Sequence, residues 1–216
     1  MKPNLHRMRV VCLLLLFSAG LAAQQTQLTD GQIKAAALEV PELAKLFELK
    51  PGMTVADVGA GFGAWTMEFA DKVGPTGRVY ATDIGAAQIA ALRAAAKMHP
   101  NVTVIEGSPQ STNLPAGCCD AILIRDAYHH LTEPAAIIKS LAGALKPGGR
   151  LAVIDFPPRP NSEVPTGVPA NRRGHGVPSD VVQSEVGAVL THVRTIADWA
   201  PDSQPNALFL VLFRKP

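Results

Sequence analysis

Short apolar segments alternate with amphipathic ones along most of this chain, and that alternation limits the folds open to it. The short segments are bounded by glycine, proline and charged residues and have the length of buried strands. Strands are expected at residues 54–58, 78–82, 102–105 and 121–124, with a fifth after the turn at 146–149, and helices at 31–49, 64–72, 86–97 and 134–145. Asp30 is expected to cap the first helix, and Pro41 to break it or begin a second. The alternation predicts a parallel sheet with helices on both faces.

The alternation of strand-like and helix-like segments stops after Asp155. Residues 156–178 contain six prolines, too many for a regular element, and predict a long loop. A last helix is expected at 181–186, followed by two closing strands at 191–199 and 207–213. A chain of 216 residues can bury one sizeable core, so we expect a single domain.

The first strand leads into VADVGAGFGAW, residues 55–65, where three glycines follow an aspartate. Gly59, Gly61 and Gly63 fall in the first strand-to-helix turn, at the carboxyl edge of the sheet, where ligands bind. Glycine suits this place because it adopts positive φ at little cost and has no Cβ to keep a ligand from the backbone. The signal is weak alone, since Gly59, Gly61 and Ala64 also satisfy the dinucleotide fingerprint G-x-G-x-x-G/A. A nicotinamide- or flavin-dependent oxidoreductase therefore stays open.

Charge narrows the choice of ligand. Asp57 puts a carboxylate beside the helix N-terminus, where the pyrophosphate of a dinucleotide would meet a like charge. No lysine or arginine lies between Lys50 and Lys72 to hold a phosphate. Asp83 ends the second strand, where it can accept both hydroxyls of a ribose. These features predict a ligand that has a ribose diol and a positive charge and lacks phosphate.

Taken in order, the motifs resemble those of the class I S-adenosylmethionine-dependent methyltransferases. DVGAGFG is similar to the first motif of that family, and VYATDI, VIEGSPQSTNLP, CDAILIRDAYHHL and LKPGGRLAVIDF are similar to the later ones, over residues 43–156. The resemblance implies a single Rossmann-like, doubly wound α/β sheet of seven strands, mostly parallel with an antiparallel last strand. It also implies S-adenosylmethionine as cofactor and in-line methyl transfer to a small-molecule acceptor. The chain is similar to the quinone-biosynthesis and arsenite methyltransferase group.

The resemblance further implies which residues contact the cofactor. The three glycines would line its methionine and ribose, Asp57 would support the amino end, and Asp83 would hold the ribose hydroxyls. Ile84 would face the adenine. Many members have an aspartate where this chain has Ser108, which is expected to accept a hydrogen bond from the adenine amino group. Asp126, first past the fourth strand, is expected to touch the cofactor. Without the resemblance, Asp57 would be read as a helix cap and Asp83 as a solvated turn residue.

Histidines are the candidates on the acceptor side. RDAYHHLTEP follows the fourth strand, so His129 and His130 emerge at the same edge as the glycine turn and are candidate general bases. His175 is a third candidate, because in this family insertions after the fifth strand cover the substrate pocket. Packing roles for the first two, and a solvated loop for His175, are the alternatives.

We expect no redox or metal-binding role for Cys118 and Cys119. Cys118 and Cys119 are adjacent, and disulfide geometry resists a bridge at that spacing, so we expect ordinary turn residues and no disulfide framework. An arsenic-binding role would need more cysteines than this chain has. No metal site is expected.

The N-terminus has the three-part layout of a secretory signal: basic residues, an apolar run from Val10 to Phe17, and small residues near Ala22 and Ala23. Residues 1–23 are expected to be a signal peptide, and 24–216 a methyltransferase domain with 156–178 as a substrate-covering loop. The apolar run is short for a bilayer span, so no membrane span is expected after cleavage. The expected location is the periplasm, or the cytoplasm if the signal is not used.

The charge of the remaining chain excludes one class of partner. Three of the 20 basic residues lie in the first 23 positions, and the other 17 nearly balance the 18 acidic ones. No basic field is left to hold a phosphate backbone, so nucleic acid is not an expected partner. The expected partner is a small-molecule acceptor, and the oligomeric state is left unknown. A non-catalytic nucleoside-binding protein of methyltransferase fold stays open beside the enzyme.

Overall fold

A seven-stranded sheet forms the centre of the structure, a computed structural model that describes residues 27–201 and 208–216. The expected signal peptide lies outside the described residues. The strand order is β3-β2-β1-β4-β5-β7-β6. β7 pairs antiparallel with β5 and β6, and the other pairs are parallel. The strands are β1 (Thr54–Val58), β2 (Arg78–Asp83), β3 (Val102–Glu106), β4 (Cys119–Arg125), β5 (Leu145–Asp155), β6 (Thr191–Ile196) and β7 (Phe209–Arg214). The expected fold class is confirmed.

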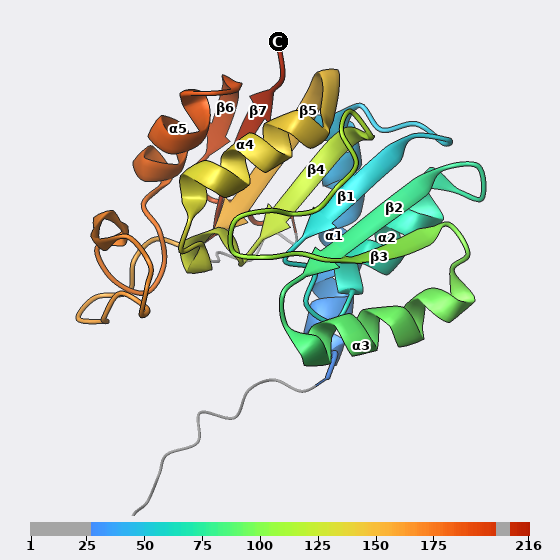
Figure 1. Cartoon of the computed structure of the whole chain (residues 1–216), viewed down its shortest axis with the longest axis horizontal. Helices are drawn as coiled ribbons and strands as arrows, with labels where there is room; N and C mark the ends of the chain where they lie inside the picture. Colours follow the sequence, from blue (N-terminus) through green and yellow to red (C-terminus); the bar gives the residue numbers. More distant parts are fainter. Residues whose placement is uncertain (1–26, 202–207) are drawn as a thin grey trace, which may run out of the picture.

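Helices cover both faces of the sheet. Figure 1 shows α4 and α5 in front of the sheet and α1 and α2 behind it. Side chains alternate accordingly along β4: Ile122 and Ile124 belong to the core under α4 and α5, and Ala121 and Leu123 to the core under α1 and α2. The helices are α1 (Asp30–Phe47), α2 (Ala64–Val73), α3 (Ala86–Ala95), α4 (Pro134–Ala144) and α5 (Ser179–Gly187), with short 3₁₀ turns η1 (Ala96–Met98), η2 (Tyr128–His130) and η3 (Ala170–Arg172). Among the described residues, none of the helices is both long and apolar enough to cross a membrane.

The first helix differs from the expectation at two points. Thr29, rather than Asp30, is its N-cap, and Thr29 forms a capping box with Gln32. Pro41 lies inside a continuous helix and neither breaks it nor starts a second. A proline removes the hydrogen bond to the carbonyl four residues earlier, here that of Ala37. Pro41 and Ala37 are both exposed, so water can satisfy the freed carbonyl.

The turn before β4 contains a disulfide between Cys118 and Cys119, so the expectation that these neighbours form no bridge is wrong. The two Cα atoms are 3.8 Å apart, closer than those of ordinary bridges between separate segments. The bridge joins Cys118, which ends the turn that Gly117 introduces with a φ of 60°, to Cys119, the first residue of β4. It therefore lies at the amino end of β4, away from the carboxyl edge where ligands bind in such sheets.

Candidate active site

The turn between β1 and α2 contains the three glycines of the first motif. The backbone N–H groups of Gly59 and Ala60 donate to the Thr82 carbonyl at 2.8 and 3.1 Å, which ties the turn to the end of β2. All three glycines have positive φ, from 56° to 92°. A Cβ at Gly59 would lie 2.5 Å from the Cβ of Ala127, whereas a Cβ at Gly61 would meet no atom within 4 Å. Gly59 thus lets two segments approach, and Gly61 borders open space that a ligand can enter.

Asp83 ends β2 next to this turn. Its carboxylate accepts hydrogen bonds from the backbone N–H groups of Gly61 at 2.9 Å, Ile84 at 2.8 Å and Gly85 at 2.9 Å. These three donors hold the carboxylate in one orientation beside the glycine turn. A carboxylate can accept about four hydrogen bonds, so Asp83 retains room for about one ligand hydroxyl rather than the expected two.

Asp57 is buried beneath the start of α2, with 3% of its surface exposed. The Thr66 hydroxyl donates to its Oδ2 at 2.6 Å. Burial raises the pKa of Asp57 from 3.8 to about 6; the hydrogen bond from Thr66 opposes this rise, and the nearby Asp83 carboxylate adds to it. A cationic group placed beside Asp57 would favour its charged form.

Ile84, Ser108 and Asp126 flank this arrangement. The Ile84 side chain is 63% exposed and offers an apolar surface beside Asp83. Asp126 is also exposed, at a φ of 55°. The Ser108 hydroxyl accepts from the backbone N–H groups of Gln110 and Ser111 at 3.3 and 3.1 Å. Ile84 and Asp126 are therefore accessible to a ligand, whereas the Ser108 oxygen is engaged in its own turn.

A buried ion pair joins α1 to the end of β4. Glu39 is 3% exposed and accepts two hydrogen bonds from Arg125, at 3.0 and 3.1 Å, and one from the Trp65 indole N–H at 2.9 Å. The guanidinium carbon of Arg125 lies 4.0 Å from the centre of the Trp65 ring. Bidentate and stacked contacts of this kind are specific to arginine. They fix α1 beside the first turn of α2, which begins directly after the glycines.

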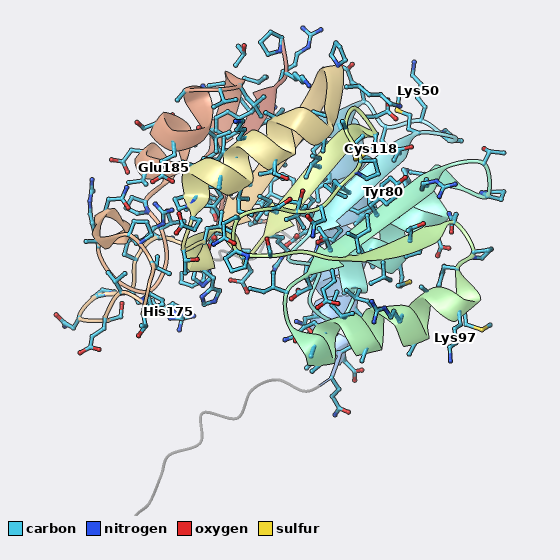
Figure 2. The ribbon with its side chains drawn as sticks, viewed as in Figure 1. Lys50, Tyr80, Lys97, Cys118, His175 and Glu185 are labelled. Carbon is cyan, nitrogen blue, oxygen red and sulfur yellow. A yellow bond between two sulfur atoms is a disulfide. The ribbon has the colours of Figure 1, made fainter. Side chains whose placement is uncertain are left out.

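Three histidines from two segments meet at the carboxyl edge of the sheet. His129 and His130 lie in η2, after β4, and His175 comes from the loop after β5. The ring centres are 3.9 Å apart for His129 and His130, 5.0 Å for His129 and His175, and 5.7 Å for His130 and His175. Figure 2 shows His175 on this loop, far from Cys118 at the opposite end of β4. The structure thus brings all three candidate general bases together.

Asp155, the last residue of β5, organises this histidine cluster. It is fully buried and accepts hydrogen bonds from His129 Nδ1 at 2.9 Å, from the His129 backbone N–H at 3.0 Å and from the Phe156 backbone N–H at 2.9 Å. Since a carboxylate only accepts, Nδ1 of His129 donates in this contact, and Nε2 is the ring nitrogen that Asp155 leaves unengaged. Partial burial and the two neighbouring imidazoles lower the pKa of His130 to about 4, and burial and His129 lower the pKa of His175. His130 and His175 are therefore neutral at pH 7.

The loop that carries His175 is anchored by a second buried network. Arg172 is fully buried and donates to both carboxylate oxygens of Glu185 in α5, at 2.8 and 3.1 Å. The Tyr128 hydroxyl donates to Glu185 at 2.7 Å. Burial would raise the pKa of Glu185, but the hydrogen bonds from Arg172, Asn171 and Tyr128 outweigh it and lower that pKa. The network ties the loop to α5 and η2; Figure 2 shows Glu185 beside the loop.

Sequence reasoning missed Asp155 and Glu39. The sequence offered a signal for Asp155, because it is an acidic residue at the end of a predicted strand, as Asp83 is. Glu39 had none, since it lies on a helix where an exposed glutamate is the ordinary expectation.

Comparisons with known proteins agree with this geometry. Residues 55–149 match the methyltransferase domain family. The ubiquinone/menaquinone biosynthesis C-methyltransferase UbiE of Shewanella woodyi is 29% identical over 145 residues, which are 66% of this chain and 55% of that protein. A solved S-adenosylmethionine-dependent methyltransferase from Aquifex aeolicus superposes with a TM-score of 0.65 at 23% identity, over 88% of this chain and 100% of that chain. The glycopeptide N-methyltransferase MtfA, solved with sinefungin, has a TM-score of 0.63 at 18% identity, over 84% of this chain and 87% of that chain.

The likeness in fold extends over more of the chain than the likeness in sequence does. The chain spans about half the length of the curated relatives it matches. The two solved structures superpose on 88% and 84% of the chain. The chain therefore has the fold of the class I S-adenosylmethionine-dependent methyltransferases, and its residues 55–149 match the methyltransferase domain family.

Proposed function

We propose that this protein is an S-adenosylmethionine-dependent methyltransferase that acts on a small-molecule acceptor. The arrangement of Asp83 and the glycine turn carries this proposal. Three backbone N–H groups orient the Asp83 carboxylate beside Gly61, and a Cβ at Gly61 would point into open space. A ligand that offers a hydroxyl to Asp83 can therefore lie directly against the backbone.

The surrounding residues fit the cofactor. Asp57 supplies a buried carboxylate suited to the cationic end of the ligand, and exposed Ile84 supplies an apolar surface for the adenine. When bound, S-adenosylmethionine supplies an electrophilic methyl group. The residues of this chain align the acceptor with that methyl group, and such alignment is the main source of rate in a displacement of this kind.

The histidine cluster supports a role on the acceptor side. His129, His130 and His175 lie at the same edge of the sheet as the glycine turn, and Ala127, two residues before His129, packs against Gly59. Neutral imidazoles can take a proton from an oxygen or carbon acid. We infer that residues 156–178 cover the acceptor and that the acceptor atom is oxygen or carbon. The C-methyltransferase relatives are in keeping with this inference.

Calorimetry on the full chain tests the cofactor. We expect S-adenosylmethionine to bind, and Asp83→Ala to weaken binding more than Ser108→Ala does, because hydrogen bonds to a charged acceptor are roughly twice as strong as neutral ones. Thermal unfolding of both variants controls for loss of fold. Equal affinities for the two variants would remove the ribose role of Asp83. Binding of NAD in place of S-adenosylmethionine would instead indicate an oxidoreductase.

Turnover is tested separately from binding. Mass spectrometry of protein purified from its native host should identify the bound nucleoside and a co-purifying acceptor. Transfer of a labelled methyl group to that acceptor would establish the activity. Tight binding without transfer to any co-purified compound would favour a non-catalytic nucleoside-binding protein.

A further inference from the structure

The three clustered histidines have the geometry of a metal site. One nitrogen from each of His129, His130 and His175 lies within 4.8 Å of the others, and the three rings come from η2 and from the loop after β5. Ring nitrogens bound to one tetrahedral ion at about 2.0–2.1 Å are about 3.4 Å apart. Small side-chain rotations of His130, which is exposed, and His175, which is half-buried, can therefore bring these nitrogens onto a common ion.

Asp155 orients the His129 ring for metal binding. It accepts the Nδ1 proton of His129 at 2.9 Å and is held by two backbone N–H groups. A metal-binding histidine commonly donates its other ring N–H to a carboxylate, which fixes the tautomer and makes the binding nitrogen more basic. Asp155 therefore leaves Nε2 of His129 as the nitrogen that can bind an ion.

The ring nitrogens of the other two histidines are also available. Within residues 27–201 and 208–216, no protein group hydrogen-bonds a ring nitrogen of His130 or His175. The hydrogen bonds of His175 involve its backbone: its N–H donates to the Ser162 hydroxyl, and its carbonyl accepts from the Arg159 N–H. His130 is exposed and His175 is half-buried, so water can reach their ring nitrogens and an ion can take its place. A bound cation would satisfy one nitrogen on each ring.

We propose that His129, His130 and His175 bind a divalent transition metal ion such as Zn²⁺, with Asp155 orienting His129. Neutral imidazole nitrogens suit zinc, copper, nickel and iron, whereas calcium and magnesium require oxygen ligands. Three protein ligands leave a fourth position open for water or for an oxygen of a small molecule, as in catalytic zinc sites. This proposal replaces the expectation from sequence that the chain has no metal site. It does not depend on methyl transfer, and nitrogens that bind the ion would not serve as general bases while it is bound.

The test uses the full chain, purified without a histidine tag and stripped with a chelator. Calorimetry should show one Zn²⁺ bound per chain, and Co²⁺ should give the intense visible absorption of a four-coordinate ion. His130→Ala and His175→Ala should each weaken Zn²⁺ binding by at least 100-fold, because each removes a ligand. Asp155→Asn should weaken it by about 10- to 100-fold, the range measured for partners of metal-binding histidines.

The chain offers matched controls. His99→Ala and His192→Ala each remove one imidazole outside the cluster and should leave the affinity unchanged. Circular dichroism and thermal unfolding of every variant exclude loss of fold, and His130 and His175 are accessible enough to replace. Absence of Zn²⁺ binding to the wild-type chain, or wild-type affinity in both His130→Ala and His175→Ala, would overturn the site. Loss of S-adenosylmethionine binding with intact Zn²⁺ binding would count against the proposed function and leave this site standing.

Discussion

Asp57 is a buried carboxylate whose proposed role in binding the cofactor would come at the expense of stability. It is almost fully buried, and burial raises its pKa to about 6. A raised carboxyl pKa means that the folded chain binds the proton more tightly than the unfolded chain does. The contribution of Asp57 to stability is therefore complete below its unfolded pKa of 3.8 and is lost as the pH rises through about 6. At pH 8 the protein holds a buried charge that no lysine or arginine contacts directly among the described residues.

Asp57→Asn should stabilise the ligand-free protein at pH 8 by about 2–3 kcal/mol, since a pKa shift of this size corresponds to about that free energy. The advantage of the variant over wild type should shrink at pH 5, where wild-type Asp57 is largely protonated. Urea unfolding of both proteins at the two pH values measures this. The same variant should bind S-adenosylmethionine more weakly, because the carboxylate that faces the cationic end is gone. An advantage of equal size at both pH values would contradict the raised pKa.

Gly59 and Gly61, in the turn between β1 and α2, have different surroundings. Gly59 is needed because η2 and the residues before it approach the turn closely, with Ala127 against Gly59. At Gly61 a Cβ would enter open space, where we propose that the ligand lies. Both have positive φ, so both carry the same kind of backbone cost on substitution.

Gly59→Ala should therefore destabilise the protein more than Gly61→Ala, by about 1–3 kcal/mol, which is the usual cost of overpacking. Gly61→Ala should nevertheless lose at least about tenfold in S-adenosylmethionine affinity, or about 1.4 kcal/mol. Chemical denaturation and calorimetry on the matched pair separate the two effects. If Gly61→Ala bound the cofactor as wild type does, the cofactor would not lie against this turn.

The loop of residues 156–178, whose one short 3₁₀ turn is η3, is anchored to the rest of the fold. Its Arg172 is paired with Glu185 and packs beside Tyr128, with the guanidinium carbon 5.3 Å from the ring centre. Residues of α4, α5 and η2 pack in one core. The contact between Arg172 and Glu185 therefore holds His175 close to His129 and His130. The three histidines are thus placed by packing on one face of the sheet.

At the scale of the whole molecule, the open question is where the protein works. We propose export, because the first 23 residues have the layout of a secretory signal. S-adenosylmethionine is made in the cytosol, so an exported enzyme needs a supply of cofactor outside it, or else the fold serves another task there. Identifying the nucleoside bound to natively purified protein would show whether the protein meets S-adenosylmethionine where it works.

A fusion of residues 1–30 to a reporter that is active only in the periplasm should be exported from a bacterial host and cleaved near Ala22 or Ala23. The matching fusion that begins at residue 24 is the control and should stay in the cytoplasm. N-terminal mass spectrometry of the exported product locates the cut. Retention of the longer fusion in the cytoplasm would overturn the proposal of export.

The sequence by itself determined the strands, most of the helices and the ligand-binding edge of this protein. These features depend on local signals: the period of apolar residues, the glycines after β1, and the aspartates at the ends of β1 and β2. β1 was predicted at its observed bounds, and the seven strands with an antiparallel last strand followed from the family resemblance. Where local reasoning went wrong, at Pro41 and at the Cys118–Cys119 bridge, the outcome depended on exposure or on the detailed path of a turn.

Only the tertiary structure decided which polar groups meet. Glu39 and Arg125 pair across 86 positions of the chain, and Asp155 reaches His129 across 26. No local pattern encodes such pairs, because each partner alone is an ordinary glutamate, arginine, aspartate or histidine. They form because parallel strands bring their carboxyl ends to one edge and because the anchored loop returns His175 to that edge. Burial excludes water from Glu39 and Asp155 and makes an unpaired carboxylate costly, so these pairs stabilise the folded chain.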